Sequence, residues 1–106
     1  MATTEPNRSE PEQQLAALRA ELDALDEQLL DVVRRRVEVC VRIAHHKSAH
    51  GVPMMQPHRI GVVHERAARY GERHGVDREF LRRLYDLIIE ETCRVEDLVM
   101  GNTPAH

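Results

Sequence analysis

Aromatic residues are scarce in this sequence of 106 residues: they make up 3% of it, and tryptophan is absent. Proteins that bind single-stranded nucleic acid stack the bases on aromatic side chains, so this composition argues against such a stacking surface. A formal net charge of −3 also argues against a general binder of polyanions. We therefore expect no nucleic-acid partner.

Long apolar runs are missing as well. No stretch approaches the roughly 20 apolar residues of a membrane-spanning helix, and the polar, acidic N-terminus does not have the pattern of a signal peptide. The two cysteines, Cys40 and Cys93, lie inside helical patterns without metal-ligand spacing, which indicates reduced, buried thiols. These features predict a cytoplasmic protein that makes no membrane contact.

Glycine and proline do not occur between Glu12 and His50, where apolar residues recur at helical spacing. The seam positions are Leu15, Leu18, Leu22, Leu25, Leu29, Val32, Arg36, Val39 and Ile43. Ser9 and Glu12 have the form of a capping box, in which each side chain bonds the backbone N–H of the other residue. The pattern predicts a helix from about Ser9 to about His50, on the order of 60 Å long at ~1.5 Å per residue.

Two shorter helices are predicted after it. The first begins near Pro57, a residue suited to a first turn, and ends at His74-Gly75. Its apolar face carries Ile60, Val63, Ala67 and Tyr70. Asp77 can cap the second, which runs to about Met100. Its inward positions are Leu81, Leu84, Ile88, Val95 and Val99. The predicted fold is all-α, with one helical domain over residues 9–100 and disordered tails at 1–8 and 101–106.

The leucine seam of the long helix is too long for the two shorter helices to cover. A compact domain of about 100 residues has a radius of gyration of only ~13 Å. An elongated coiled coil is one solution. A homodimer with antiparallel long helices is the solution we favour, because two-fold symmetry lets each copy cover the seam of the other.

Charged residues interrupt this seam. Arg36 occupies a seam position, and Lys47 follows 11 residues later, close to three full turns, so both point the same way. Their Cα atoms are then ~16 Å apart along the helix axis, which leaves room for a small dianion between the two side chains. The alternative is that each buries its apolar stem and keeps its charge in water at the rim.

Further polar candidates lie on the other helices. Thr92 and Glu96 are four residues apart on the face of Ile88 and Val95. The alternative for Thr92 is a bond to the carbonyl one turn back, and for Glu96 a packing salt bridge with Arg36 or Lys47. Arg59 has surface exposure as its alternative.

Two other patterns have weaker interpretations. His46 and His50 could form half of a metal site, but no third ligand lies at a suitable spacing, so we expect no metal. The Arg34-Arg35-Arg36 run could mark a nucleic-acid patch, but Asp31 and Glu38 dilute it and favour a solvated face. We expect no cofactor.

Read in order, these residues resemble the all-helical chorismate mutase family over about residues 12–100. LAALRAELDALDEQLL resembles the start of the family's first helix, and FLRRLYDLIIEETCRVEDL resembles its third. The family's polar positions fall at Arg19, Arg36, Lys47, Arg59, Thr92 and Glu96. The resemblance implies an intertwined, domain-swapped helical homodimer with two equivalent sites, each of which borrows Arg19 from the other chain.

Two positions depart from the usual family pattern, which has acidic residues where this sequence has Gln56 and Ile60. With VPMMQPHRI, they bring the sequence closer to the members of the family that act on 4-amino-4-deoxychorismate in antibiotic pathways through p-aminophenylalanine. The resemblance to chorismate mutases proper and to isochorismate-pyruvate lyases, which also have an aliphatic residue at the Ile60 position, keeps both activities open.

The implied reaction is a Claisen rearrangement of a small dicarboxylate, which needs no nucleophile. The resemblance implies that Arg19 of the other chain and Arg36 bind the carboxylates, and that Lys47 and a protonated Glu96 donate to the ether oxygen. It also implies that Thr92, Arg59 and Gln56 bind the remaining groups, beside Ile60. A dimerisation or adaptor coiled coil and a helical transcription regulator are the non-enzymatic alternatives.

Overall fold

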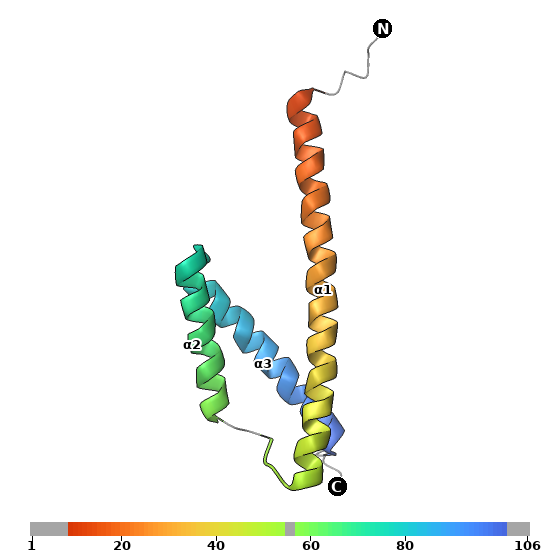
Figure 1. Cartoon of the computed structure of the whole chain (residues 1–106), viewed down its shortest axis with the longest axis vertical. Helices are drawn as coiled ribbons and strands as arrows, with labels where there is room; N and C mark the ends of the chain where they lie inside the picture. The colour runs from red at the N-terminus through yellow and green to blue at the C-terminus, as the bar shows by residue number, and fades with distance from the viewer. Residues whose placement is uncertain (1–8, 55–56, 102–106) are drawn as a thin grey trace. The chain divides into compact units, whose positions relative to one another are not determined.

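The computed structural model describes residues 9–54 and 57–101. Over these residues the structure consists of three helices, labelled in Figure 1: α1 (Glu10–His50), α2 (Pro57–His74) and α3 (Arg78–Met100). The all-α prediction is confirmed, and so are the expected helix ends. The predicted tails lie outside the described residues, apart from Gly101, which adopts a left-handed conformation (φ 73°) and caps α3.

The described chain divides between Arg36 and Val37 into two compact units. The first unit is the N-terminal part of α1, and it begins with the predicted capping box. The Ser9 hydroxyl accepts from the Glu12 N–H at 3.2 Å, and the Ser9 N–H donates to the Glu12 carboxylate at 3.1 Å. The leucines of the seam, from Leu15 to Leu29, are exposed. A single stretch of helix cannot bury its own apolar seam.

The second unit contains the end of α1 together with α2 and α3. Figure 1 shows α2 and α3 as an antiparallel pair, joined by a short turn through Gly75. Gly75 has a φ of +72°, a left-handed conformation that glycine adopts without steric cost. Asp77 then caps α3 as predicted, because its carboxylate accepts from the Phe80 N–H at 2.8 Å.

Small residues allow the helices of this unit to approach closely. Gly71 on α2 is buried, and a Cβ atom built on it would lie 2.6 Å from the backbone oxygen of Val76. Ala44 on α1 is fully enclosed, with an exposed fraction of 0%, and Cys40 and Val95 are buried with it. On α2, Ala67 is buried, whereas Tyr70 at the end of the predicted apolar face is 52% exposed and stacks on His74.

The three helices are amphipathic rather than apolar all round. Over the residues that the structure describes, none of them has the length and apolar content that a bilayer crossing requires.

Candidate active site

An ion pair in the second unit joins two of the predicted catalytic residues. The Lys47 ammonium, in the last turn of α1, lies 2.9 Å from Oε1 of Glu96 on α3. Figure 1 shows the end of α1 beside the C-terminal half of α3, where this contact forms. The side chains are 15% and 6% exposed. A cation and a carboxylate so poorly hydrated are costly to bury, and each compensates the charge of the other.

A second bond fixes the position of Lys47. Its ammonium also donates to the backbone oxygen of Met54, in the segment after α1, at 2.9 Å. An ammonium carries three N–H donors, and these two bonds use two of them. Lys47 is therefore held in place by the protein and, counting its partners among residues 9–54 and 57–101, has one donor left for a bound ligand.

Thr92 lies one turn before Glu96 on α3 and contacts the same stretch of α1. Its hydroxyl donates to the backbone oxygen of Ile88 at 3.0 Å, so the predicted bond to the preceding turn is present. The Cys40 thiol lies 3.6 Å from the Thr92 oxygen and donates to it. Lys47–Glu96 and Cys40–Thr92 thus form two polar contacts between α1 and α3, with Ala44 between them in sequence.

The remaining predicted residues are dispersed over the chain. On α2, Ile60 is half-buried and Arg59 is exposed. Gln56 lies outside the described residues. Arg19 and Arg36 belong to the first unit, where Arg19 is exposed and Arg36 is half-buried. Their approach to Lys47 and Glu96 stays a prediction.

Two members of this polar cluster were not predicted from the sequence. The backbone oxygen of Met54 carries no side-chain signal, and it precedes Met55 and Gln56, in a segment where no helical period fixes the conformation. Cys40 was expected only to be buried. Its spacing of seven residues from Lys47, two helical turns, places both side chains on one face and was the available signal.

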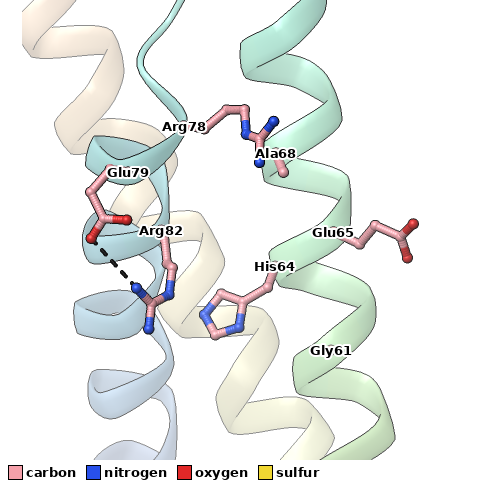
Figure 2. Close-up of a pocket in the computed structure, with 7 residues that line it drawn as sticks. All are labelled: Gly61, His64, Glu65, Ala68, Arg78, Glu79 and Arg82. Carbon is pink, nitrogen blue, oxygen red and sulfur yellow. Dashed lines mark hydrogen bonds and ion pairs between the residues drawn. The ribbon is translucent and has the colours of Figure 1, made fainter.

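A separate open groove lies between α2 and the N-terminal half of α3 (Figure 2). Its lining residues are Gly61, His64, Glu65, Ala68, Arg78, Glu79 and Arg82. The arginines of this groove are paired with nearby carboxylates, Arg78 with Glu72 at 2.8 Å and Arg82 with Glu79 at 3.4 Å. None of the predicted site residues lines it, so the candidate active site is the cluster around Lys47 and Glu96.

The alternative sites are not supported by the described part of the chain. No group of three or more metal-ligating side chains occurs there. The rings of His46 and His50 stack at 4.3 Å between centroids, and His50 Nδ1 lies 2.9 Å from the His46 backbone oxygen.

The arginine run on α1 forms surface ion pairs. Arg34 donates to Asp31 at 2.7 Å, and Arg35 lies 3.9 Å from the same carboxylate. The bond from Arg34 holds the pKa of Asp31 below its ordinary value. On α3, a two-bond contact with Arg94 likewise lowers the pKa of Glu91. The ion pairs with Asp31 favour the solvated-face interpretation for Arg34 and Arg35.

The cluster suits the stabilisation of negative charge on a ligand. Its donor is the Lys47 ammonium, which the Glu96 carboxylate and the Met54 backbone oxygen hold in place. Preorganised donors of this kind lower the energy of a transition state in which negative charge develops.

Comparison with known sequences identifies the family of the chain. Residues 18–97 match the chorismate mutase type II family, and the chain belongs to that family. The family membership places it among the chorismate-mutase-type isomerases.

Two relatives in Streptomyces are much more similar to the chain than the other members compared. The 4-amino-4-deoxychorismate mutase of Streptomyces venezuelae is 65% identical over 88 residues, covering 83% of this chain and 85% of the relative. The enzyme of the same name in Streptomyces pristinaespiralis is 59% identical over 92 residues, covering 85% of this chain and 71% of the relative. The bifunctional chorismate mutase/prephenate dehydratase of Escherichia coli is 32% identical, and the match covers 84% of this chain but 23% of that protein.

Proposed function

We propose that this chain catalyses the Claisen rearrangement of 4-amino-4-deoxychorismate to 4-amino-4-deoxyprephenate. The observation that carries the proposal is the identity of 65% and 59% to two enzymes named for this substrate, against 32% to a chorismate mutase/prephenate dehydratase. The buried Lys47–Glu96 pair gives the proposal a chemical basis, because it holds the Lys47 ammonium in place as a donor for an ether oxygen, and the reaction needs no nucleophile.

The reaction is a pericyclic shift of the enolpyruvyl group from a ring oxygen to a ring carbon. The enzyme has to hold a flexible dianion in a compact conformation in which the reacting atoms are close. It also has to stabilise the negative charge that builds on the ether oxygen as the C–O bond breaks. No net proton transfer is needed.

Lys47 and Glu96 would act together on the ether oxygen. Lys47 offers its third N–H donor while its bonds to Glu96 and Met54 hold it in place. A carboxylate can only accept, so Glu96 donates only when it is protonated. In that form Oε1 still accepts from Lys47, and the proton is carried on Oε2.

The other predicted residues would bind the rest of the substrate. Guanidinium groups match carboxylates with two parallel bonds, which suits Arg36 and the Arg19 of a second chain to the two carboxylates. Thr92 and Arg59 would fix the remaining polar groups. Gln56 would accept from the C4 amine, where an amide oxygen replaces an acidic side chain.

A homodimer is part of this proposal. The leucines of the α1 seam are exposed, and an antiparallel copy of the same helix would cover them by two-fold symmetry. Such a domain-swapped arrangement would bring the Arg19 of one chain to the site of the other. The proposal includes a place in a pathway to p-aminophenylalanine-derived antibiotics, which the family resemblance implies, and a cytoplasmic location, which the composition predicts.

The test is a comparison of three substrates with the purified protein. We expect kcat/KM for 4-amino-4-deoxychorismate to exceed that for chorismate, since Gln56 and Ile60 replace acidic residues near C4. Equal or reversed preference would assign the chain to the chorismate mutases proper. Release of pyruvate from isochorismate would assign it to the lyases.

A further inference from the structure

The Cys40–Thr92 contact suggests a role for a residue that the proposed mechanism does not use. Cys40 is 6% exposed, and its sulfur lies 3.6 Å from the Thr92 hydroxyl oxygen, within the range of a thiol donor. The two residues are on different helices, so the contact depends on how the end of α1 packs on α3. The thiol thus contacts Thr92, a residue to which the proposed function assigns a part in binding the substrate.

The hydrogen bonds of Thr92 restrict what its hydroxyl can do. A hydroxyl has one proton and two acceptor lone pairs. In the structure the proton is donated to the Ile88 backbone oxygen, and one lone pair accepts from Cys40. A substrate carboxylate or ether oxygen can only accept, so Thr92 can bind it only by turning its proton away from Ile88.

Turning the proton costs little at this position. The Ile88 carbonyl lies inside α3, where the backbone N–H of Thr92 is its helical partner, so the carbonyl stays bonded when the hydroxyl turns away. Rotation of the proton about the Cβ–Oγ1 bond does not itself displace the oxygen, so the bond from the Cys40 thiol need not break. One atom thus stays fixed while the proton changes partner.

We propose that Cys40 is a positioning residue for Thr92: its thiol holds the hydroxyl oxygen while the Thr92 proton turns from Ile88 to an accepting group of the substrate. This inference rests on the proposed function, because it assumes that Thr92 contacts the substrate. A thiol is a weak donor, which suits a bond that must hold an oxygen without competing with the ligand.

The bond itself can be tested without any activity measurement. Cys93→Ala leaves Cys40 as the single thiol of the chain, and its S–H stretching band lies in an otherwise empty part of the infrared spectrum. Hydrogen bonding lowers this frequency, so Thr92→Val in the same background should raise it. Identical band positions with Thr92 and with Val would overturn the proposal.

The positioning role is tested by kinetics with a pair of matched variants. Cys40→Ala and Cys40→Ser both remove the sulfur volume, but only serine keeps a donor. We expect Cys40→Ala to lower kcat/KM by about 3- to 10-fold, the scale of one hydrogen bond, and Cys40→Ser to restore most of it. Cys93→Ala is the control and should match the wild type.

A double-mutant cycle separates this role from simple packing. If Cys40 acts through Thr92, Cys40→Ala should have almost no further effect on kcat/KM once Thr92 is valine. Equal losses in Cys40→Ala and Cys40→Ser, or losses that add to that of Thr92→Val, would overturn the proposal. A wild type inactive on all three substrates would contradict the proposed function instead, and the infrared comparison would still decide the Cys40–Thr92 bond.

Discussion

Lys47 and Glu96 show how a charged pair can be buried when each partner is satisfied. Glu96 is buried, with 4% of the whole residue exposed. The Lys47 ammonium donates to its carboxylate at 2.9 Å and also donates to the Met54 backbone oxygen. Among the described residues, no buried side-chain nitrogen or oxygen lacks a hydrogen-bond partner. Removal of one partner of a buried pair leaves the other charge uncompensated, which typically costs about 3–5 kcal/mol.

Lys47→Ala should therefore affect both stability and turnover. We expect the free energy of unfolding to fall by about 3–5 kcal/mol, because Glu96 is left buried without its partner. We also expect kcat to fall by about 10²-fold or more, because a preorganised donor is lost. Urea unfolding and steady-state rates measure the two effects. Arg78→Ala is the matched control, since its pair with Glu72 is exposed and should contribute less than about 1 kcal/mol.

Glu96→Gln separates the charge of this residue from its donor. The amide oxygen can still accept from Lys47, and the amide N–H₂ can donate to the ether oxygen in place of a protonated carboxyl group. We expect this variant to fold and to keep most of its activity, whereas Glu96→Ala should lose about 10²-fold in kcat. A Gln variant as inactive as the Ala variant would show that Glu96 acts only as the ionised partner of Lys47.

Two glycines of α2 lead to opposite predictions for stability. A Cβ at Gly71 would lie 2.6 Å from the Val76 backbone oxygen and 3.1 Å from a methyl group of Leu81, so the turn between α2 and α3 would have to shift. A Cβ at Gly61 has nothing within 4 Å. We expect Gly71→Ala to destabilise the protein, and Gly61→Ala to stabilise it by roughly 0.5–1 kcal/mol through helix propensity.

Urea unfolding of the two alanine variants measures this difference. A Gly71→Ala protein as stable as the wild type would mean that α2 and α3 do not approach each other as closely as the structure shows.

The helices themselves were predictable because their signals are local. Ser9 with Glu12, Gly75 and Asp77 each mark a helix end through groups within a few residues, and the structure has all of them as predicted. The contacts of the site depend instead on tertiary packing. The sequence placed Lys47 on the seam side of its helix and left open whether Glu96 pairs with Arg36 or with Lys47. The ion pair of Glu96 with Lys47, and the bond from Lys47 to the Met54 backbone oxygen, depend on how the end of α1 packs on α3.

The proposed site is shared between two chains. If the Arg19 of one chain serves the site of the other, a mixture of Arg19→Ala and Arg36→Ala proteins should regain activity. Each mixed dimer has one intact site, and half of the dimers are mixed after free exchange, so roughly a quarter of the wild-type rate is expected. Steady-state rates before and after subunit exchange measure the recovery.

The matched control is a mixture of Arg36→Ala and Lys47→Ala proteins. Both residues are proposed to serve the site of their own chain, so no mixed dimer has an intact site and no activity should return. Sedimentation should show a folded dimer in every sample at low micromolar concentration. Lack of recovery in the first mixture, with exchange demonstrated by mass, would contradict the shared site.

The most direct test of the proposed function is to follow 4-amino-4-deoxychorismate by NMR in the presence of the purified protein. We predict that 4-amino-4-deoxyprephenate appears as the substrate disappears, without pyruvate, and about 10²-fold more slowly with the Lys47→Ala variant. Unchanged substrate, or conversion at the same rate by wild type and Lys47→Ala, would contradict the assignment of this activity to the Lys47–Glu96 site.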